Sequence, residues 1–456
     1  MNSVSIQERK IEGMLTVTDI IAATGGKVVR MTPDSFTGIS IDSRKTVESE
    51  LFIALRGSRF DGHDFLGEAL KTGAGAIVSL QTGDFPEDKT IIHVKDTLKA
   101  LQDIAHFMRL KRGIPVIGIT GSNGKTTTKE LTASVLSTAY RVLKNTGNLN
   151  NSIGLPLSLT KISREDEVVV LEMGASTSGE IRELCDIAVP NYGVLTNVSP
   201  SHLEGFGDLA TVRKTKLEIL DAVNIAVVNA DDLFMMEGIR ESGFKGMIVR
   251  YGIENQAEIF ASEIRLHEKG SSFIIHTPEG KPVGVSPKIS GMFNIYNVLA
   301  AAAVGYLFHI DLADMKKPID SFEGVPMRLE FRDWEGARVI SDVYNANPAS
   351  MEEALKELVR TRRKRAIAIL GDMLELGPYE EEAHRKIGRL LSELAVEIFI
   401  AVGPRMAFAA SEFKGVAYTL PSASEAGRLL REIRREGDMI LIKGSRGMHM
   451  EKVLEA

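Results

Sequence analysis

The sequence at residues 116–127 reads Val-Ile-Gly-Ile-Thr-Gly-Ser-Asn-Gly-Lys-Thr-Thr. Its first five residues form an apolar, β-branched run that predicts a buried strand, and a helical pattern occupies residues 129–136. A strand that leads through a glycine-containing turn into a helix is the context of a phosphate-binding loop. A strict P-loop has glycine where this chain has Ile119, so the motif here is a variant that begins at Thr120-Gly121.

The residues of this turn have the chemistry that phosphate binding requires. Glycines let backbone N–H groups close around phosphate oxygens, and the helix N-terminus adds partial positive charge. Lys125 is placed to reach the outer phosphates and Thr126 to bind Mg²⁺. The strand before the turn and the helix after it disfavour a chance glycine-rich turn. We therefore expect nucleotide phosphates to bind at Gly121, Ser122, Asn123, Gly124, Lys125, Thr126 and Thr127.

Strand and helix patterns alternate on both sides of this motif, which predicts parallel sheets with helices on both faces. Upstream, short β-rich runs and a helix at residues 97–112 predict a small α/β domain. Downstream, the alternation continues nearly to the end of the chain. The predicted strands are residues 38–41, 51–55, 76–80, 90–94, 116–120, 168–173, 193–198, 225–230, 339–343, 366–370, 398–402 and 439–443.

Other segments have patterns of their own. Between residues 258 and 290, short alternating runs with glycine turns predict an antiparallel appendage, and a helix is predicted at 292–308. The polar, proline-containing segment 314–326 predicts a linker. A later helix is predicted from Ser350, because Ser350 and Glu353 have the spacing of a capping box.

The length of the chain, 456 residues, exceeds what one hydrophobic core usually organises. At roughly 150 residues per domain, it predicts about three domains. We predict an α/β protein with an N-terminal domain at residues 1–112, a central parallel-sheet domain like that of P-loop ATPases at 113–314, and a C-terminal Rossmann-like doubly wound domain at 315–456.

Composition narrows the class of protein. The chain has 55 Lys and Arg against 61 Asp and Glu, so it lacks the basic surface that holds a nucleic-acid backbone, and the basic run at 360–365 is interpreted as a solvated helix end. The single cysteine, Cys185, is expected in the core and fits a reducing compartment. Residues 1–15 lack the apolar segment of a secretory signal, and the longest apolar run, 298–308, is too short to span a membrane. We expect a cytoplasmic protein without membrane insertion.

Bound phosphates require a metal ion, and its protein ligands are expected at the carboxyl ends of strands in an open parallel sheet. Glu172 ends one predicted strand, where an acid is costly unless it is used; the alternative is a helix N-cap. His202 follows the next strand, where it is either a metal ligand or an ordinary loop histidine, and the spacing leaves both interpretations open. Lys216 is one of several cations on a predicted helix, which by itself favours a solvated lysine.

These residues together resemble the Mur ligases, the ATP-dependent amide-forming enzymes of cytoplasmic peptidoglycan assembly. The Thr-Gly-x-x-Gly-Lys-Thr form of the loop is typical of them, and the resemblance runs from about residue 16 to 451. Within the family, the sequence most resembles the members that add D-alanyl-D-alanine. The strings that support this are Ile-Ser-Ile-Asp-Ser-Arg at 39–44, Asp-Gly-His at 61–63, Asn-Leu-Asn-Asn at 148–151, Asp-Val-Tyr-Asn-Ala-Asn-Pro at 342–348, Leu-Gly-Asp-Met-Leu-Glu-Leu-Gly at 370–377 and Lys-Gly-Ser-Arg-Gly at 443–447.

The resemblance implies that the first domain binds the UDP end of the substrate, the second binds ATP, and the third closes over with the incoming amine. It implies ATP and two Mg²⁺ ions, with Thr126, Glu172, His202 and Lys216 as metal ligands. Lys216 aligns with a lysine that these ligases carbamylate, which turns a cation into an anionic ligand and reverses the interpretation of that residue. Catalytic roles are implied for Lys125, Lys216, His202 and Glu172.

Further binding residues follow from the same resemblance. Asn294 and Asn297 match the adenine-side helix, although the family usually has His where Phe293 stands. Arg328 matches an arginine near the ATP phosphates. The residues implied for the two other substrates are Ser40, Asp42, Ser43, Arg44, Asn148, Asn151, Asp342, Asn345 and Asn347. Of these, the last three are implied near the dipeptide or the reaction centre.

The implied activity is an ATP-dependent ligase, a monomer, that joins D-alanyl-D-alanine to UDP-N-acetylmuramoyl-tripeptide through an acyl phosphate. A diaminopimelate- or lysine-adding ligase is the alternative, but such enzymes usually carry Asp-Asn-Pro-Arg, and this sequence lacks that string. Rivals from other classes are a P-loop phosphotransferase or switch ATPase and a non-catalytic nucleotide-sugar sensor. The third residue of the acceptor tripeptide, diaminopimelate or lysine, is left open.

Overall fold

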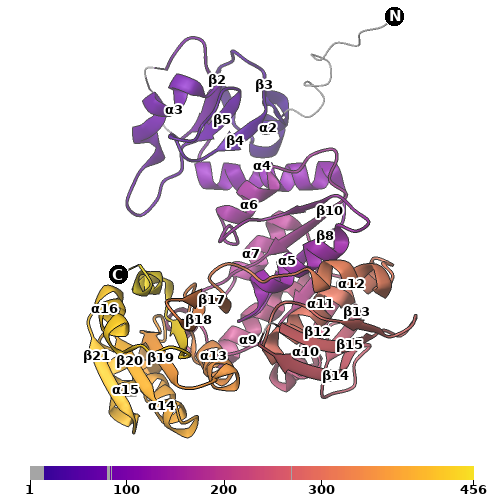
Figure 1. Cartoon of the computed structure of the whole chain (residues 1–456). Coiled ribbons are helices and arrows are strands. Elements are labelled where there is room, and N and C mark those ends of the chain that lie inside the picture. Colours follow the sequence, from indigo (N-terminus) through magenta and orange to yellow (C-terminus); the bar gives the residue numbers. More distant parts are fainter. Residues whose placement is uncertain (1–14, 80–82, 84, 269, 456) are drawn as a thin grey trace, which may run out of the picture. The chain divides into compact units, whose positions relative to one another are not determined.

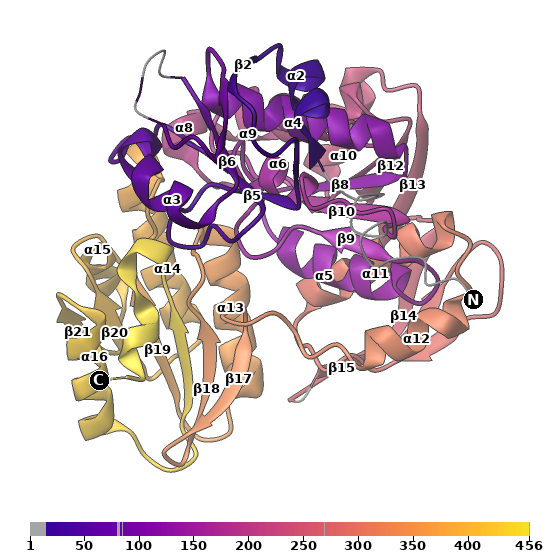
Figure 2. The ribbon, with the colours of Figure 1, turned by 90° about the horizontal axis from the view of Figure 1, so that it is seen from above.

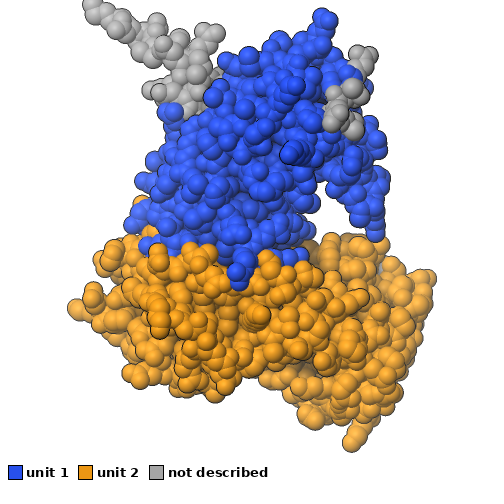
Figure 3. Space-filling view, turned by 180° about the vertical axis from the view of Figure 1, so that it is seen from behind, with its two compact units in different colours: residues 1–118, 140–174, 180–192 blue, residues 119–139, 175–179, 193–456 orange. Residues whose placement is uncertain are grey.

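The computed structural model describes residues 15–79, 83, 85–268 and 270–455, which form an α/β structure (Figure 1). The chain divides into two compact units, coloured separately in Figure 3. The first contains residues 1–118, 140–174 and 180–192, and the second contains 119–139, 175–179 and 193–456. The prediction that residues 1–15 carry no secretory signal lies almost wholly outside the described residues. Among the described helices, none is long and apolar enough to cross a membrane.

The N-terminal part is built on a five-stranded sheet of order β2-β7-β6-β5-β4. Alternate residues of its strands face opposite sides, so Leu51 and Ile53 pack with helix α4 while Phe52 packs with helix α3. Strands β4 to β7 pair in parallel, and β2 is antiparallel at the edge. The elements are β1 (Leu15–Thr16), α2 (Val17–Thr24), β2 (Lys27–Arg30), β3 (Ser35–Phe36), β4 (Gly38–Ser40), β5 (Glu50–Ile53), α3 (Leu66–Thr72), β6 (Gly75–Val78), β7 (Thr90–His93) and α4 (Thr97–Arg112).

Helix α4 begins and ends where local chemistry predicts. The Asp96 side chain accepts hydrogen bonds from the N–H groups of Leu98 and Lys99 at 2.8 and 3.0 Å, which caps the first turn. Gly113 ends the helix in the left-handed conformation, with φ at 63°. The predicted helix at 97–112 is therefore confirmed at both ends.

The central sheet has nine strands in the order β16-β15-β14-β13-β12-β11-β8-β10-β9. Strands β8 and β11 each contain residues of both units. The strands are β8 (Val116–Thr120), β9 (Val142–Lys144), β10 (Val168–Glu172), β11 (Tyr192–Leu195), β12 (Ile225–Asn229), β13 (Met247–Gly252), β14 (Ile259–His267), β15 (Gly270–His276) and β16 (Val283–Val285). The helices are α5 (Lys125–Leu136), α6 (Gly154–Leu159), α7 (Glu180–Ala188), α8 (Leu203–Phe206), α9 (Leu209–Leu217), α10 (Leu233–Ser242), α11 (Met292–Leu307) and α12 (Leu312–Asp320).

The C-terminal sheet has six strands in the order β17-β18-β22-β19-β20-β21, all parallel except the edge strand β17. Helices α13 to α15 pack on one face and α16 on the other (Figure 2). This confirms the predicted doubly wound arrangement. The elements are β17 (Glu330–Trp334), β18 (Ala337–Asp342), α13 (Pro348–Thr361), β19 (Ala366–Gly371), α14 (Glu380–Glu393), β20 (Ile398–Val402), α15 (Met406–Glu412), β21 (Val416–Leu420), α16 (Ala423–Ile433) and β22 (Met439–Lys443).

Three sequence-based expectations about segments were wrong. The strands at 258–290 are antiparallel as predicted, but β14 pairs in parallel with β13, so they extend the central sheet and are no separate appendage. The first half of the predicted linker forms helix α12, in which Pro318 is tolerated inside the helix. The cap of α13 is Asn347, with Ser350 as its capping-box partner, because Pro348 occupies the first helical position.

The basic run at 360–365 lies largely exposed at the end of α13, as predicted, but its arginines are paired with carboxylates. Arg360 binds the carboxylate of Glu357 at 2.6 Å, and Arg365 binds that of Asp438, also at 2.6 Å. Arg363 pairs with Glu268. The local sequence did not reveal these partners, because two of them come from distant segments. Cys185 is buried in α7, as expected.

Candidate active site

The glycine-containing turn at 121–124 joins β8 directly to α5. Gly121 and Gly124 both have positive φ, 142° and 81°. A Cβ at Gly121 would lie 2.0 Å from the hydroxyl oxygen of Thr196, and one at Gly124 would lie 2.4 Å from Oδ1 of Asn297. Only glycine fits both positions, and helix α5 begins four residues earlier than the periodicity predicted.

Residues that follow β11 hold this turn in place. The Ser122 N–H donates to the Asn197 carbonyl at 2.8 Å, and the Ser122 hydroxyl donates to the Ser199 carbonyl at 2.9 Å. The Asn123 N–H donates to Oδ1 of Asn197 at 3.0 Å, while the Thr196 hydroxyl donates to the Asn123 carbonyl at 2.6 Å. The loop is therefore preorganised by its own unit.

Lys125 and Thr126 start helix α5, where the helix dipole favours anions. The Lys125 ammonium donates to the carbonyls of Gly121 and Ser122 at 2.8 and 3.1 Å, so it lies over the loop. The Thr126 hydroxyl accepts a hydrogen bond from the Arg328 guanidinium at 3.0 Å. Arg328 also stacks on the Tyr344 ring, 4.0 Å from its centroid. The expected position of Arg328 next to the phosphate loop is thus observed.

Glu172 ends β10 in the first unit and is 3% exposed. Its Oε1 accepts a hydrogen bond from the Asn150 side chain at 2.7 Å, and its backbone is held by both polar atoms of the Asn145 side chain. Among the described residues, Oε2 of Glu172 is buried without a hydrogen-bond partner. A buried carboxylate oxygen without a partner costs free energy unless a cation or a hydrogen-bond donor is bound to it. Because the carboxylate of Glu172 bonds only Asn150 among the described residues, it does not cap a helix, which was the alternative interpretation.

Lys216 is 1% exposed near the end of α9. Its ammonium donates to the Ala175 carbonyl at 3.2 Å and lies 5.2 Å from the centroid of the Phe206 ring. The solvated lysine that the local pattern favoured is therefore ruled out. The neighbouring Lys214 does point to solvent, as expected for a cation on this helix.

His202 precedes α8 and has left-handed backbone torsions, φ 51° and ψ 35°. Its Nδ1 contacts Oε2 of Glu375, which lies in the string at 370–377. This hydrogen bond is the main cause that lowers the pKa of the Glu375 carboxyl. His202 is thus engaged by a carboxylate and is not an ordinary loop histidine.

The second unit contains Lys125, Thr126, His202 and Lys216, whereas Glu172 belongs to the first. Within the described ranges, no three His, Cys, Asp or Glu side chains converge in the manner of a protein-only metal site. The predicted ligand set has only two such residues, since it also uses a hydroxyl and a modified lysine.

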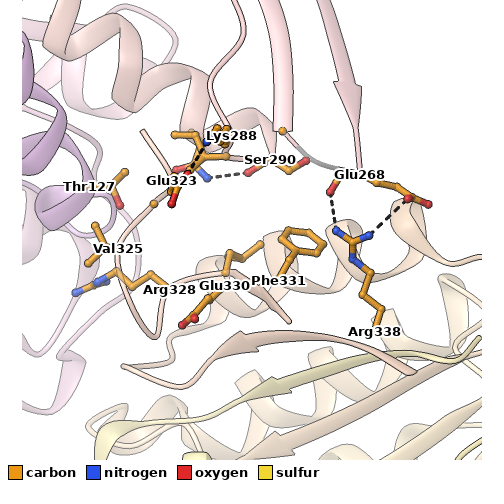
Figure 4. A pocket seen from close by; sticks show the side chains of 15 residues that line it. Thr127, Glu268, Lys288, Ser290, Glu323, Val325, Arg328, Glu330, Phe331 and Arg338 are labelled. Carbon is orange, nitrogen blue, oxygen red and sulfur yellow. Dashed lines mark hydrogen bonds and ion pairs between the residues drawn. The ribbon is translucent and has the colours of Figure 1, made fainter. Parts of the chain in front are cut away.

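The two asparagines of helix α11 that were predicted to bind the nucleotide, Asn294 and Asn297, have different surroundings. Asn294 lines a cavity of about 270 Å³, together with Thr127 of the phosphate loop and Arg328. Figure 4 shows Thr127, Val325 and Arg328 at one side of this cavity, and Glu268 with Arg338 at the opposite end. Asn297 is not among the lining residues. Its side chain donates to Asn294 at 3.0 Å and accepts from Thr128 at 3.1 Å, so it supports the loop and Asn294.

The residues predicted for the UDP-sugar substrate lie in the first unit, where Ser40 ends β4 and Asp42, Ser43 and Arg44 follow it. Asp42 pairs with Arg44 at 2.9 Å, and this hydrogen bond lowers the pKa of Asp42. Ser43 donates to Glu68 at 2.5 Å, and Ser40 is buried beside Thr46. Asn148 and Asn151 are the other predicted substrate residues of this unit, and Asn148 is exposed. Asn151 accepts from the N–H groups of residues 153 and 154, which positions the start of α6.

The predicted dipeptide residues divide into three environments. Asp342 forms a buried ion pair with Lys443, whose ammonium also donates to the Asn345 carbonyl at 3.0 Å. The Asn345 side chain is exposed. Asn347 caps α13 and donates to Oδ1 of Asn123 in the phosphate loop at 2.8 Å. Asn347 is thereby tied to the nucleotide site.

Sequence reasoning missed several supporting residues. Asn145 and Asn150 position Glu172, but the sequence assigns a role to neither. Asn145 lies outside the motif strings, and within the string at 148–151 the resemblance implies Asn148 and Asn151. Glu375 and Lys443 also lay inside such strings without a role assigned to them. The strings were the available signal, but the partners lie 22 residues away for Asn150, 101 for Lys443 and 173 for Glu375.

The loop at 371–377 is anchored by a buried histidine. The Met373 N–H donates to Nε2 of His384 at 3.0 Å, and Nδ1 donates to the Glu380 carbonyl at 2.6 Å, which identifies a neutral ring. Burial is the main cause that lowers the pKa of His384. The unfolded chain therefore takes up a proton below pH 6.5 that the folded chain resists, and folding stability is lost as pH falls.

We expect the free energy of unfolding to decrease between pH 7.5 and 5.5 more in the wild type than in His384→Gln, by at most about 1.4 kcal/mol per pH unit. The glutamine amide can replace both ring hydrogen bonds without titrating. Urea unfolding followed by circular dichroism at the two pH values measures this. The exposed His309 serves as control, since His309→Asn should keep the wild-type pH dependence. An identical pH dependence in wild type and His384→Gln would contradict the prediction.

Sequence models of one family match three parts of the chain. The Mur ligase catalytic-domain model matches residues 35–109, the middle-domain model matches 119–305, and the glutamate ligase domain model matches 327–446. The chain belongs to the Mur ligase family. The UDP-N-acetylmuramoyl-tripeptide–D-alanyl-D-alanine ligase of Bacillus subtilis is 35% identical over 431 residues, 92% of each chain. The Escherichia coli enzyme of the same name is 34% identical over 424 residues, 92% of this chain and 93% of that protein.

Solved structures agree with the sequence relatives. MurF from Acinetobacter baumannii superposes with a TM-score of 0.90 at 31% identity, over 97% of this chain and 98% of that chain. MurF from Thermotoga maritima in complex with ADP has a TM-score of 0.81 at 28% identity, over 92% and 96%. Folylpolyglutamate synthase of Mycobacterium tuberculosis, at 16% identity and TM-score 0.62, shares the fold alone.

These matches confirm the predicted family, the three-domain α/β fold and the assignment to the ligases. The domain boundaries after residues 112 and 314 stay a prediction. The second of them falls inside α12, so a junction after residue 320 accords better with the helix.

Proposed function

We propose that this chain is an ATP-dependent ligase that joins D-alanyl-D-alanine to UDP-N-acetylmuramoyl-tripeptide, with ADP and phosphate as the other products. The observation that carries the proposal is the braced phosphate loop, with Lys125 lying over it and Arg328 bonded to Thr126. The activity of the relatives from B. subtilis and E. coli supports the choice of substrates. The reaction belongs to cytoplasmic peptidoglycan precursor synthesis.

The nucleotide is assigned to one continuous site. The loop at 121–127 would bind the phosphates through its N–H groups and Lys125. The cavity beside Thr127, lined by Asn294 and Arg328, would take the nucleoside. Asn297 would act indirectly, by holding Asn294 and the loop. The ADP bound in the T. maritima structure supports ATP as the nucleotide.

Two Mg²⁺ ions fit the chemistry of the donor set. The buried Oε2 of Glu172 has no protein partner among the described residues, and a cation would complete it. The Thr126 hydroxyl, His202 and Lys216 would supply the other protein ligands. Bound Mg²⁺ supplies positive charge to the phosphate oxygens and stabilises the leaving group.

Lys216 is proposed to act as a carbamate. Its neutral amine would add to CO₂ and release one proton, which leaves an anionic ligand in place of a cation. The burial of Lys216 beside Phe206 supports this, because a solvated lysine would have no such enclosure. The carbamate would provide the negative charge that a second divalent ion requires.

Chemistry then proceeds in two steps. The terminal carboxylate of the tripeptide attacks the γ-phosphorus of ATP, a new P–O bond forms, the β–γ bridging bond breaks, and ADP leaves. Lys125 neutralises the charge that develops on the phosphates. The amine of D-alanyl-D-alanine attacks the acyl phosphate, loses a proton and expels phosphate through a tetrahedral intermediate. Closure of the C-terminal domain would keep water from the acyl phosphate.

The other substrates are assigned by the motif residues. Ser40, Asp42, Ser43 and Arg44 would contact the UDP end, and Asn148 and Asn151 would bind substrate from the central domain. Asn345, whose side chain is exposed beside the Asp342–Lys443 pair, would face the dipeptide. Asp342 and Asn347 would position this region, one through Lys443 and the other through the phosphate loop. We propose a monomer that needs neither nucleic acid nor membrane insertion.

Phosphate release with each substrate combination tests the proposal. We expect release only when ATP, UDP-N-acetylmuramoyl-tripeptide and D-alanyl-D-alanine are all present, with the pentapeptide product detected by mass spectrometry. Acceptors ending in diaminopimelate and in lysine would be compared, which identifies the third residue. ATP hydrolysis that is independent of both substrates would instead support a switch ATPase, and nucleotide binding without turnover would support a sensor.

A further inference from the structure

The loop at 371–377 of the C-terminal part contacts the segment around α8 at two points. The Glu375 carboxylate binds Nδ1 of His202, and the Glu375 carbonyl accepts a hydrogen bond from the Glu204 N–H at 3.0 Å. A Cβ on Gly377 would lie 3.2 Å from Cα of Glu204, so the two backbones approach closely here. The contact joins residues 173 positions apart in the sequence.

Both residues of this pair have unusual backbones. Glu375 has φ 64° and His202 has φ 51°, in the left-handed region that non-glycine residues rarely adopt. Such conformations persist only where surrounding structure enforces them, and they concentrate at functional sites. The polar side chains of these two residues are in contact.

The loop is held rigidly from behind. Leu374 donates its N–H to the Ser445 hydroxyl at 2.8 Å, and the His384 ring accepts from Met373. The Asp372 side chain accepts from the Met406 N–H at 2.7 Å, at the start of α15. Glu375 itself is 57% exposed on its side chain, so the fold does not need it for packing.

The pairing determines which nitrogen of His202 is available. A carboxylate only accepts hydrogen bonds, so Nδ1 of His202 carries the proton and Nε2 keeps its lone pair. Within the described part of the chain, Nε2 makes no hydrogen bond. Histidines that bind metals usually donate their other N–H to a carboxylate, which orients the ring and raises its basicity.

We propose that Glu375 is a positioning residue that orients His202 for metal binding, so that docking of the C-terminal loop completes the metal site. The inference rests on the proposed function, because it takes His202 as a Mg²⁺ ligand. It assigns a role to an acid of the C-terminal part that does not itself touch metal or substrate. Metal affinity and domain closure are coupled through this one contact.

Mn²⁺ binding provides the test, since it needs no turnover. Free Mn²⁺ would be measured by electron paramagnetic resonance with a non-hydrolysable ATP analogue and full-length protein. We expect Glu375→Ala to weaken Mn²⁺ binding about 10–100-fold, the usual effect of removing an outer-shell carboxylate. Glu375→Gln keeps an acceptor and should lose less. Glu381→Ala, an exposed acid on α14 paired with Arg385, is the matched control and should bind like the wild type.

A double-mutant cycle separates orientation of His202 from general loss of negative charge. In a His202→Ala background, Glu375→Ala should cause no further loss of Mn²⁺ affinity. An equal loss in both backgrounds, unchanged affinity in Glu375→Ala, or tighter binding, which would mark the pair as an inhibitory latch, overturns the proposal. If His202→Ala itself binds Mn²⁺ like the wild type, the proposed ligand set is wrong and the inference falls with it.

Discussion

Replacement of Lys216 by alanine is expected to reduce ligase activity on the order of 10²–10³-fold, the scale of losing one electrostatic contact to the transition state. The variant would lack the carbamate and thus the anionic group proposed to balance the second metal ion. Because Lys216 is enclosed, its removal leaves a cavity near Phe206 and Ala175. Formate or acetate added to Lys216→Ala should enter that cavity and partly restore product formation.

Two further variants separate chemistry from folding. Lys216→Met fills the space without an amine, so it should be inactive and should not respond to short carboxylates. Lys214→Ala removes an exposed cation two residues earlier on the same helix and should retain wild-type activity. Product formation would be measured with all three substrates, and thermal unfolding would verify that each variant folds. Full activity in Lys216→Ala would refute the carbamate role.

The buried ion pair between Lys443 and Asp342 is the second site of large expected effect. Both side chains are nearly inaccessible, 2% and 9% exposed. Lys443→Met would leave the Asp342 carboxylate buried without its cation, so we expect a loss of about 3–5 kcal/mol in the free energy of unfolding. Urea unfolding at neutral pH, followed by circular dichroism, measures that loss.

The control is Lys356→Met. Lys356 also lies 2.9 Å from two carboxylates, those of Glu352 and Glu353, but its side chain is 50% exposed. Its removal should cost roughly 0–1 kcal/mol. Adding Asp342→Asn to Lys443→Met should recover much of the loss, because no charge is then left buried. Equal destabilisation by Lys443→Met and Lys356→Met would show that burial does not control the cost.

Much of the fold was predictable because its signals are local. Strands β8, β20 and β22 and helix α4 have the predicted bounds, since each is a run of apolar residues or of helical periodicity with clear ends. Strand β21 and helices α15 and α16 were not predicted. The residues of β21 at the sheet edge are exposed or half-buried, and none is fully buried, which weakens the apolar signal.

The candidate site was only partly predictable. The phosphate loop was recognisable because it is a continuous motif, whereas Arg328, 202 residues from Thr126, was placed beside it only by the family resemblance. Lys216 was misread by local pattern, since a lysine among surface cations carries no mark of its burial. Asn297 stays a prediction for the adenine side, and the structure adds that its side chain bonds Thr128 and Asn294.

The sequence by itself determined the class of the chain, the alternation of strands and helices, and the phosphate loop, because these depend on neighbouring residues and on their periodicity. The tertiary structure alone decided which polar groups meet: Glu375 with His202, Asp342 with Lys443, and Asn150 with Glu172. Polar partners come from distant segments, and their meeting depends on sheet order and loop packing. The periodicity of apolar residues along the sequence predicts which face of a helix or strand is buried. Only the assembled fold determines which polar side chains pair with one another.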